Sequence, residues 1–354
     1  MSNIKVGFPH VGNYYVPATY LFSHILSANV VKAPKITQKT IDIGVKYSPE
    51  FICTPFKYTL GTMIELLENG CNVLIQLGGG CRYGYYYELQ KQILKDLGYE
   101  FSYINLISGG KTDIRKIYRE LKKIDKKLSV VKSIYYLLIT VKMVKYMDIV
   151  DDYIRCNVGF EVKKGKMEKL NLEMLDKFSK VKNIFELKKI YKKYFKLIKN
   201  VCLNKPSNVK NIGIVGELYT VMEPFSNYNL EKELASFNMS IKRYTNAHYL
   251  LFEKGKFMKR NLKKYSKYVK YKMGADASDN IIRTVDMCKE SFDGIIHIKS
   301  SFCTPEIGSM GIINKVCKDY DVPVLFFSFD SNTSKVGLKT RLEAFNDMIE
   351  MRNI

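Results

Sequence analysis

The sequence predicts an α/β protein built from two doubly wound parallel-sheet domains with a helical insertion between them. Short apolar runs alternate with helical stretches near both ends of the chain, several runs end in glycine, and the middle is helical and rich in lysine. A chain of 354 residues is longer than a single hydrophobic core usually accommodates. We therefore expect a first α/β domain at 1–110, a lysine-rich helical segment at 111–208 and a second α/β domain at 209–354.

The first α/β segment alternates strands with helices. Helical periodicity runs over 59–69 and stops at Gly70, whereas the run 71–77 has the length and apolarity of a buried strand. Strands that are separated by helices pair in parallel through right-handed crossovers. The expected order is strand 5–8, helix 14–27, strand 29–32, helix 59–69, strand 71–77, helix 85–97 and strand 101–106.

The second α/β segment follows the same pattern. Its first strand ends at Gly216, and a later strand leads directly into the loop of Cys303. Loops at the carboxyl ends of parallel strands are where open α/β sheets bind ligands. The expected order is strand 211–216, helix 230–237, strand 239–242, strand 293–298, helix 307–320, strand 322–327 and helix 340–350.

The net charge of +22 raises the question of a nucleic-acid partner. The lysine excess accompanies abundant Ile, Asn and Tyr and no Trp, which is typical of a general composition bias. No motif of an RNA-binding sheet, zinc finger or recognition helix occurs. A basic surface equally suits an acidic protein or a phosphate-bearing substrate such as a coenzyme A ester. We predict no nucleic-acid partner.

The chain has the features of a cytoplasmic protein. Its start lacks a charged-then-apolar leader, and its most apolar helical stretch, 133–150, is interrupted by Lys142, Lys145 and Asp148, so we expect no membrane association. In that compartment the eight cysteines should be reduced thiols. No Cys-x-x-Cys pair occurs, so a metal site would have to combine distant segments.

Three cysteines occur at expected junctions between strands and helices. Cys53 and Cys303 each precede Thr-Pro, and proline in the first turn of a helix loses no hydrogen bond. Each thiol thus lies near a helix N-terminus, which stabilises a thiolate. Cys81 follows glycines that include Gly79 and Gly80, whose backbone can approach a bulky anion or cluster closely. Thiols in this pattern favour an iron–sulfur site, although buried thiols in a core remain the alternative.

Other residues are weaker candidates. Glu217, His297 and Glu306 lie near strand or helix ends, where acid–base chemistry is possible, but helix-terminal carboxylates and a hydrogen-bonded supporting histidine are alternative interpretations. Cys156 is a possible fourth metal ligand. The glycine run lacks Rossmann spacing, and no Gly-Lys-Ser/Thr phosphate loop occurs, so the chain carries no ATPase signature.

An ordered set of motifs resembles the 2-hydroxyacyl-CoA dehydratase family. The most similar branch is that of the activase-related proteins, often labelled "CoA protein activase". The resemblance covers nearly the whole chain outside the helical middle. The motifs that carry it are Cys53–Lys57, Gly79–Tyr85, Gly216–Tyr219, Glu223–Asn227, His297–Glu306 and Thr340–Phe345.

The resemblance implies two Rossmann-like domains and a 4Fe–4S cluster held by Cys53, Cys81 and Cys303, with one iron open to substrate. Gly79, Gly80 and Arg82 would then adjoin the cluster. A separate ATP-hydrolysing iron–sulfur activase would deliver low-potential electrons, and a larger homologous subunit or a second copy of the chain would complete the enzyme. The reaction would dehydrate a CoA ester or reduce a small molecule.

Two alternatives remain open within this resemblance. A related branch holds an 8Fe–9S double-cubane cluster on six cysteines and reduces small molecules, whereas only three of the eight cysteines here lie in motif-like settings. The chain would also fit a non-catalytic accessory or electron-transfer subunit of such a complex.

Overall fold

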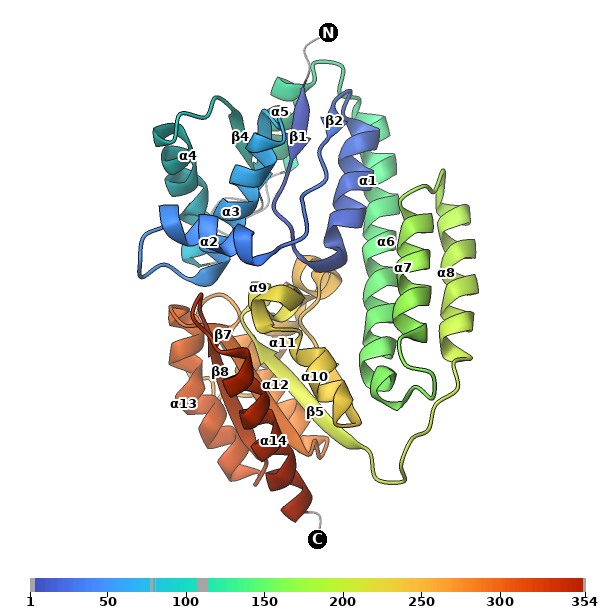
Figure 1. Cartoon of the computed structure of the whole chain (residues 1–354), viewed down its shortest axis with the longest axis vertical. Helices are drawn as coiled ribbons and strands as arrows, with labels where there is room; N and C mark the ends of the chain where they lie inside the picture. The colour runs from blue at the N-terminus through green and yellow to red at the C-terminus, as the bar shows by residue number, and fades with distance from the viewer. Residues whose placement is uncertain (1–3, 77–78, 80, 107–113, 353–354) are drawn as a thin grey trace. The chain divides into compact units, whose positions relative to one another are not determined.

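The computed structural model describes residues 4–76, 79, 81–106 and 114–352, and it confirms the expected α/β fold class (Figure 1). The chain divides into two compact units, Met1–Lys142 and Met143–Ile354, called here the first and the second unit. All eight expected strands are present. They are β1 (Lys5–Gly7), β2 (Asn29–Val30), β3 (Val73–Gln76), β4 (Ser102–Asn105), β5 (Lys210–Gly216), β6 (Met239–Arg243), β7 (Gly294–Ser300) and β8 (Val324–Phe329).

Each unit contains one four-stranded sheet, and all strand pairs in both sheets are parallel. The first sheet has the order β2-β1-β3-β4 and the second has the order β6-β5-β7-β8. The order therefore reverses between β1 and β3 in one sheet and between β5 and β7 in the other. Such a reversal opens a crevice beyond the carboxyl ends of the two strands, which is the usual ligand position of this fold.

Helices cover both faces of the first sheet. Successive strand residues point to opposite faces, so Leu74 packs on one side and Val73 and Ile75 on the other. The face of Leu74 is covered by α3 and α4, and the opposite face by α1, α5 and the beginning of α6. The helices of this part of the chain are α1 (Tyr15–Ile25), α2 (Gln38–Tyr47), α3 (Thr54–Glu68), α4 (Tyr86–Asp96), α5 (Ile114–Ile124) and α6 (Val130–Asn157), the last of which ends in the second unit.

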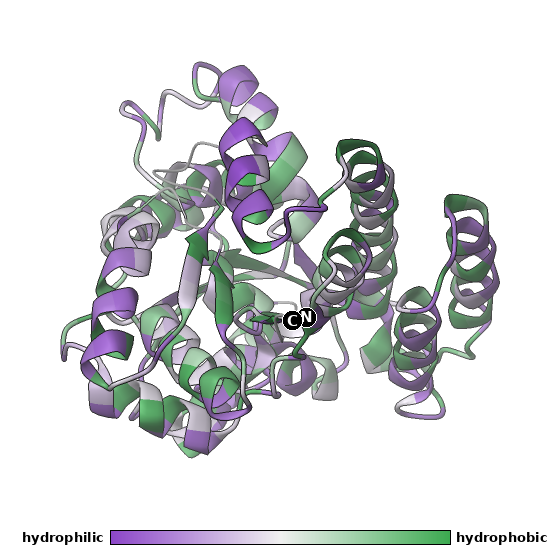
Figure 2. Cartoon of the chain, turned by 90° about the horizontal axis from the view of Figure 1, so that it is seen from above, coloured by the Kyte–Doolittle hydropathy of each residue, from purple (hydrophilic) through white to green (hydrophobic). Residues whose placement is uncertain are grey.

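The second sheet is enclosed in the same way. Ile296 and Ile298 of β7 face a core with α10 and α14, whereas Ile295 faces α12 and α13. In Figure 2 the strands are largely green, because both faces of a covered parallel sheet are apolar. The remaining helices are α7 (Lys166–Phe178), α8 (Ile184–Lys199), α9 (Leu218–Met222), α10 (Leu230–Ser236), α11 (Lys254–Asn261), α12 (Ala277–Lys289), α13 (Thr304–Asp319) and α14 (Lys335–Arg352).

Helices α2 and α3 touch each other through paired glycines. A Cβ atom on Gly44 would lie 1.9 Å from the carbonyl oxygen of Lys57, and one on Gly61 would lie 2.0 Å from that of Thr40. Only glycine at both positions allows the two backbones to approach this closely. The contact fixes α3, whose N-terminus follows Cys53, against α2.

The lysine-rich middle of the chain is helical, as the sequence predicts. Helices α5 to α8 occupy it, and their lysines lie mainly on exposed faces. Within the described ranges, no helix is both long and apolar enough to cross a membrane.

Candidate functional site

The first unit places Cys53 at the start of a buried helix. Its extended backbone (φ −66°, ψ 147°) precedes α3, and Pro55 occupies the first turn. The helix begins five residues before the periodic stretch 59–69, at the N-terminus that the Cys-Thr-Pro turn predicts, because proline fits the first turn without the loss of a hydrogen bond. The Cys53 thiol forms a hydrogen bond with the Tyr86 hydroxyl.

Cys81 lies close to the same tyrosine. It precedes a short 3-10 turn, and its Sγ accepts a hydrogen bond from the Tyr83 N–H at 3.4 Å. Burial raises the pKa of Tyr86 far above its usual range, and negative charge on Cys53 and Cys81 raises it further. Of the three predicted cysteines, Cys53 therefore bonds this hydroxyl group directly and Cys81 acts on it through charge.

The surroundings of these thiols combine aromatic packing with one cation. The Tyr86 ring packs edge-on against Phe56, with ring centroids 4.9 Å apart. Arg82 is exposed, and its charge opposes the rise in the Tyr86 pKa. Gly79 lies against Tyr83, because a Cβ atom on it would meet the tyrosine Cβ at 3.1 Å. Gly80, the other predicted glycine, lies outside the described residues.

A buried polar network supports the end of β3. The Tyr103 hydroxyl donates to Gln76 and lies 3.0 Å from Gln90 Oε1, and the Gln90 amide donates to Thr59 Oγ1 at 2.7 Å. Gln76 Nε2 is buried without a hydrogen-bond partner among the described residues. Sequence reasoning missed these residues, although a glutamine closing an apolar strand was a visible signal.

The second unit gathers its predicted residues at the carboxyl ends of β5 and β7. His297 is fully buried in β7, and its Nε2 lies 2.8 Å from Oε2 of Glu306, in the first turn of α13. Asn280 of α12 donates from Nδ2 to the same oxygen at 2.9 Å and to the Gly216 carbonyl at 3.0 Å. His297 Nδ1 and Glu306 Oε1 have no hydrogen-bond partner in the described part of the chain.

Gly216 makes this arrangement possible. Its φ is +153°, and a Cβ atom there would lie 1.8 Å from the Ile298 carbonyl oxygen. No other residue fits at that position, so β5 ends in close contact with β7. The next residue, Glu217, then caps α9 and accepts hydrogen bonds from the N–H groups of Tyr219 at 2.8 Å and Thr220 at 2.9 Å.

Cys303 begins α13 in the same manner as Cys53 begins α3. It is buried in an extended conformation, Pro305 lies in the first turn, and its N–H donates to the Ser300 carbonyl at 3.0 Å. Lys299 is buried nearby, and its charge interacts with those of Cys303 and Glu306. Burial lowers the pKa of Lys299 from its ordinary value, an effect that these negative charges oppose.

Further ionisable groups lie near His297 and Glu306 in the second unit. Lys254 pairs with Asp276 and donates to the Ala275 carbonyl at 3.0 Å. Asp279 accepts a hydrogen bond from the Tyr249 hydroxyl at 2.7 Å. No spacing in the sequence joins these residues to Glu306, because α11 packs on α12, and α12 on α13, only in the folded chain.

Glu217, in the same unit, has a pKa near neutral pH. Removal of its carboxyl from water raises its pKa to about 7, and the nearby Asp276 adds to the rise, whereas hydrogen bonds from Thr220 and Tyr219 oppose it. A carboxyl group with such a pKa can accept or release a proton at physiological pH.

Replacement of Glu217 with glutamine should remove a pH dependence of stability. An acid with a raised pKa in the folded state stays protonated after the unfolded chain has lost its proton, so the free energy of unfolding falls as pH rises from about 4.5 to about 7. Relative to the native chain, Glu217→Gln should gain about 2–3 kcal/mol between pH 5 and pH 8. Urea unfolding at both pH values measures this difference, and equal pH slopes for the two proteins would contradict the prediction.

Three charged residues of the motifs have structural partners elsewhere. Lys57 donates to the Glu50 carbonyl at 3.2 Å, Arg341 donates to the Phe326 carbonyl at 2.7 Å, and Glu223 accepts from the Phe225 N–H at 3.2 Å. Cys156, the possible fourth ligand, donates to the Ile241 carbonyl at 3.4 Å. Among the described residues, no three His, Cys, Asp or Glu side chains form a group that could hold a metal ion.

The strand order gives two of the cysteines equivalent positions. Cys81 follows β3 and Cys303 follows β7, and each strand adjoins the first strand of its own sheet. Residues 234–349 match the protein family described as 2-hydroxyglutaryl-CoA dehydratase, D-component. The match shows that this segment is similar to a component of that enzyme family. No curated protein matches the chain.

The match to the dehydratase component contains part of the candidate site. It includes His297, Cys303 and Glu306, whereas Cys53 and Cys81 precede it. The activase-related branch stays a prediction from the motifs.

Proposed function

We propose that the chain is an iron–sulfur component of a 2-hydroxyacyl-CoA dehydratase-type system, with Cys53, Cys81 and Cys303 as the ligands of a 4Fe–4S cluster. The observation that carries the proposal is the equivalent placement of Cys81 and Cys303, each after the third strand of a sheet with the same order. That strand borders the ligand crevice of this fold. The family match over residues 234–349 adds independent support.

The donor set has the chemistry that such a cluster requires, since thiolates are the usual ligands of iron–sulfur centres. Cys53 is hydrogen-bonded to the Tyr86 hydroxyl, and negative charge on Cys81 also acts on that group. Cys303 has the buried cation of Lys299 nearby, which offsets negative charge on the sulfur. When bound, a cluster with three protein ligands would supply single electrons and one open iron position for substrate or a small ligand.

The chain's own ionisable groups would handle protons. Glu217, with a pKa of about 7, can exchange a proton with solvent or substrate near neutral pH. His297 and Glu306 are buried and joined by a hydrogen bond between Nε2 and Oε2, which would position the start of α13. Electrons would come from a separate ATP-hydrolysing iron–sulfur activase. The reaction would be dehydration of a CoA ester or reduction of a small molecule, with a homologous subunit or second copy completing the enzyme.

Anaerobic reconstitution with iron and sulfide tests the proposal. We expect about four iron and four sulfide per chain and an electron paramagnetic resonance signal after reduction. Iron close to zero after reconstitution would overturn it. Turnover of a 2-hydroxyacyl-CoA with an added activase then separates a catalytic component from an accessory subunit, which would hold iron without turnover.

A further inference from the structure

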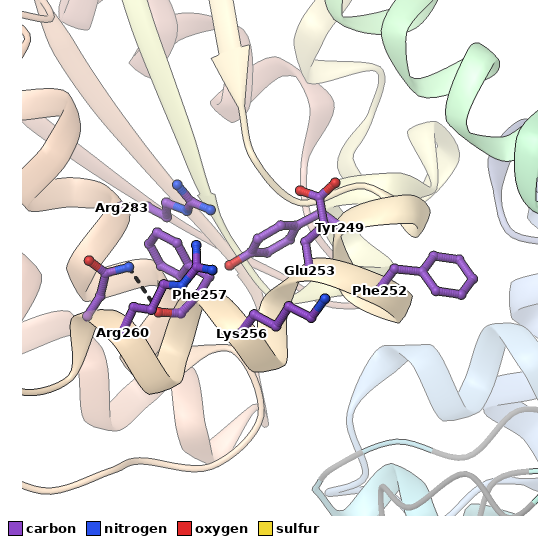
Figure 3. A pocket seen from close by; sticks show the side chains of 8 residues that line it. Tyr249, Phe252, Glu253, Lys256, Phe257, Arg260 and Arg283 are labelled. Carbon is purple, nitrogen blue, oxygen red and sulfur yellow. Dashed lines mark hydrogen bonds between the residues drawn. The ribbon is translucent and has the colours of Figure 1, made fainter.

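The second unit contains a pocket that the proposed iron–sulfur chemistry does not use. It has a volume of about 330 Å³ and lies beside the π-helical turn Tyr249–Glu253 and the helix α11 (Figure 3). Its volume falls at the lower end of the range for small-molecule sites, about 300–1,000 Å³. Single turns of π-helix occur frequently at functional sites, because the extra residue redirects the side chains of the turn.

One wall of the pocket is a guanidinium group held by aromatic rings. The centre of the Arg283 guanidinium lies 3.6 Å from the ring centroid of Phe257, 4.1 Å from that of Tyr244 and 4.9 Å from that of Tyr249. Its Nε lies 3.6 Å from Asp279 Oδ1, beyond hydrogen-bond distance, and has no hydrogen-bond partner among the described residues. Arg283 is therefore held by the aromatic rings and by its ion pair with Asp279, and only its buried Nε makes no hydrogen bond to a described residue.

Two further cations line the pocket from α11. Lys256 and Arg260 are exposed and lie one turn apart, and neither has an ion pair or side-chain hydrogen bond within the part of the chain that the structure describes. Glu253 also lines the pocket, but its carboxylate lies 3.1 Å from Nδ1 of His248. The pocket thus presents three cations against one carboxylate.

We propose that this pocket binds a nucleoside phosphate. Lys256, Arg260 and Arg283 would bind the phosphate groups, for which arginine and lysine are the usual donors. The aromatic wall of Tyr249 and Phe257 would contact the planar base, and the volume suits one nucleotide rather than a dinucleotide. Three convergent cations favour a diphosphate over a single carboxylate. The proposal does not depend on the cysteines or on a cluster.

Calorimetric titration of the full-length chain with adenosine diphosphate, pyrophosphate and adenosine tests the proposal. Pyrophosphate tests the contribution of the phosphate groups, and adenosine tests the contribution of the base. We expect saturable binding of the diphosphate, and binding at least about tenfold weaker for pyrophosphate and for adenosine alone. Pyrophosphate or adenosine binding as tightly as the nucleotide would overturn the proposal. So would the absence of saturation by about 1 mM nucleotide.

A charge-matched pair of variants separates the pocket from the general basic surface. Lys256→Ala with Arg260→Ala should weaken binding of adenosine diphosphate at least about tenfold. Lys259→Ala with Lys263→Ala removes the same charge from exposed positions that do not line the pocket, and it should leave the affinity unchanged. Equal affinities in the two double variants would overturn the proposal. Circular dichroism confirms that both variants remain folded.

Discussion

Alanine in place of Cys81 should reduce the iron bound after anaerobic reconstitution from about four atoms per chain to well under one. A cluster with three protein ligands has no spare donor, so the loss of one thiolate leaves two cysteines and an unstable centre. Cys81 is only half-buried, so its truncation should leave the fold intact. Iron and sulfide analysis with electron paramagnetic resonance measures the loss.

The exposed Cys202 provides the control for this experiment. It lies in the connection between α8 and β5 and has no motif around it, so Cys202→Ala should retain the iron content of the native chain. Serine in place of Cys53 or Cys303 should act like the Cys81 variant. Native iron content in any one of these three variants would remove that residue from the ligand set.

Alanine in place of Glu306 should lower the free energy of unfolding by about 3–5 kcal/mol. The carboxylate is the partner of His297 and accepts a hydrogen bond from Asn280, and all three residues are buried. Its removal leaves two polar groups without their partner in a site that water does not reach. Denaturant unfolding of the metal-free chain measures the change without any contribution from a cluster.

Glu343 allows the effect of charge to be separated from the effect of burial. It lies exposed on α14 and its Oε1 is 4.0 Å from Lys339 Nζ, which is a surface pair of small energetic value. Glu343→Ala should therefore change the unfolding free energy by less than about 1 kcal/mol. A similar loss in both variants would show that the buried network contributes little beyond its charge.

The strands could be predicted because the apolar composition of each strand directly indicates its burial. The run 73–75 in β3 is apolar at successive positions, as expected of a strand that is covered on both faces. The helix α2 was not predicted, since Gly44 in its sequence normally weakens a helix. The glycine is required by a residue in another segment, because the carbonyl of Lys57 leaves no space for a side chain at position 44.

The candidate site was predictable to the extent that its chemistry is local. The Cys-Thr-Pro turns place Cys53 and Cys303 at helix starts through proline geometry alone. The partners of these residues were not predictable in the same way. Tyr86 contacts Cys53, and Asn280 contacts Glu306, because in each unit two helices pack on the same face of a sheet. A single sequence does not show which helices pack together.

Helix α3 determines how steadily Cys53 is held over time. All of its residues from Thr54 to Leu67 are buried, and Gly61 locks it against α2. Amide hydrogens in such a helix exchange with solvent only when the whole unit unfolds, not through local opening. The thiol at its N-terminus therefore keeps its position for as long as the fold lasts, and slow amide exchange along α3 would record that lifetime.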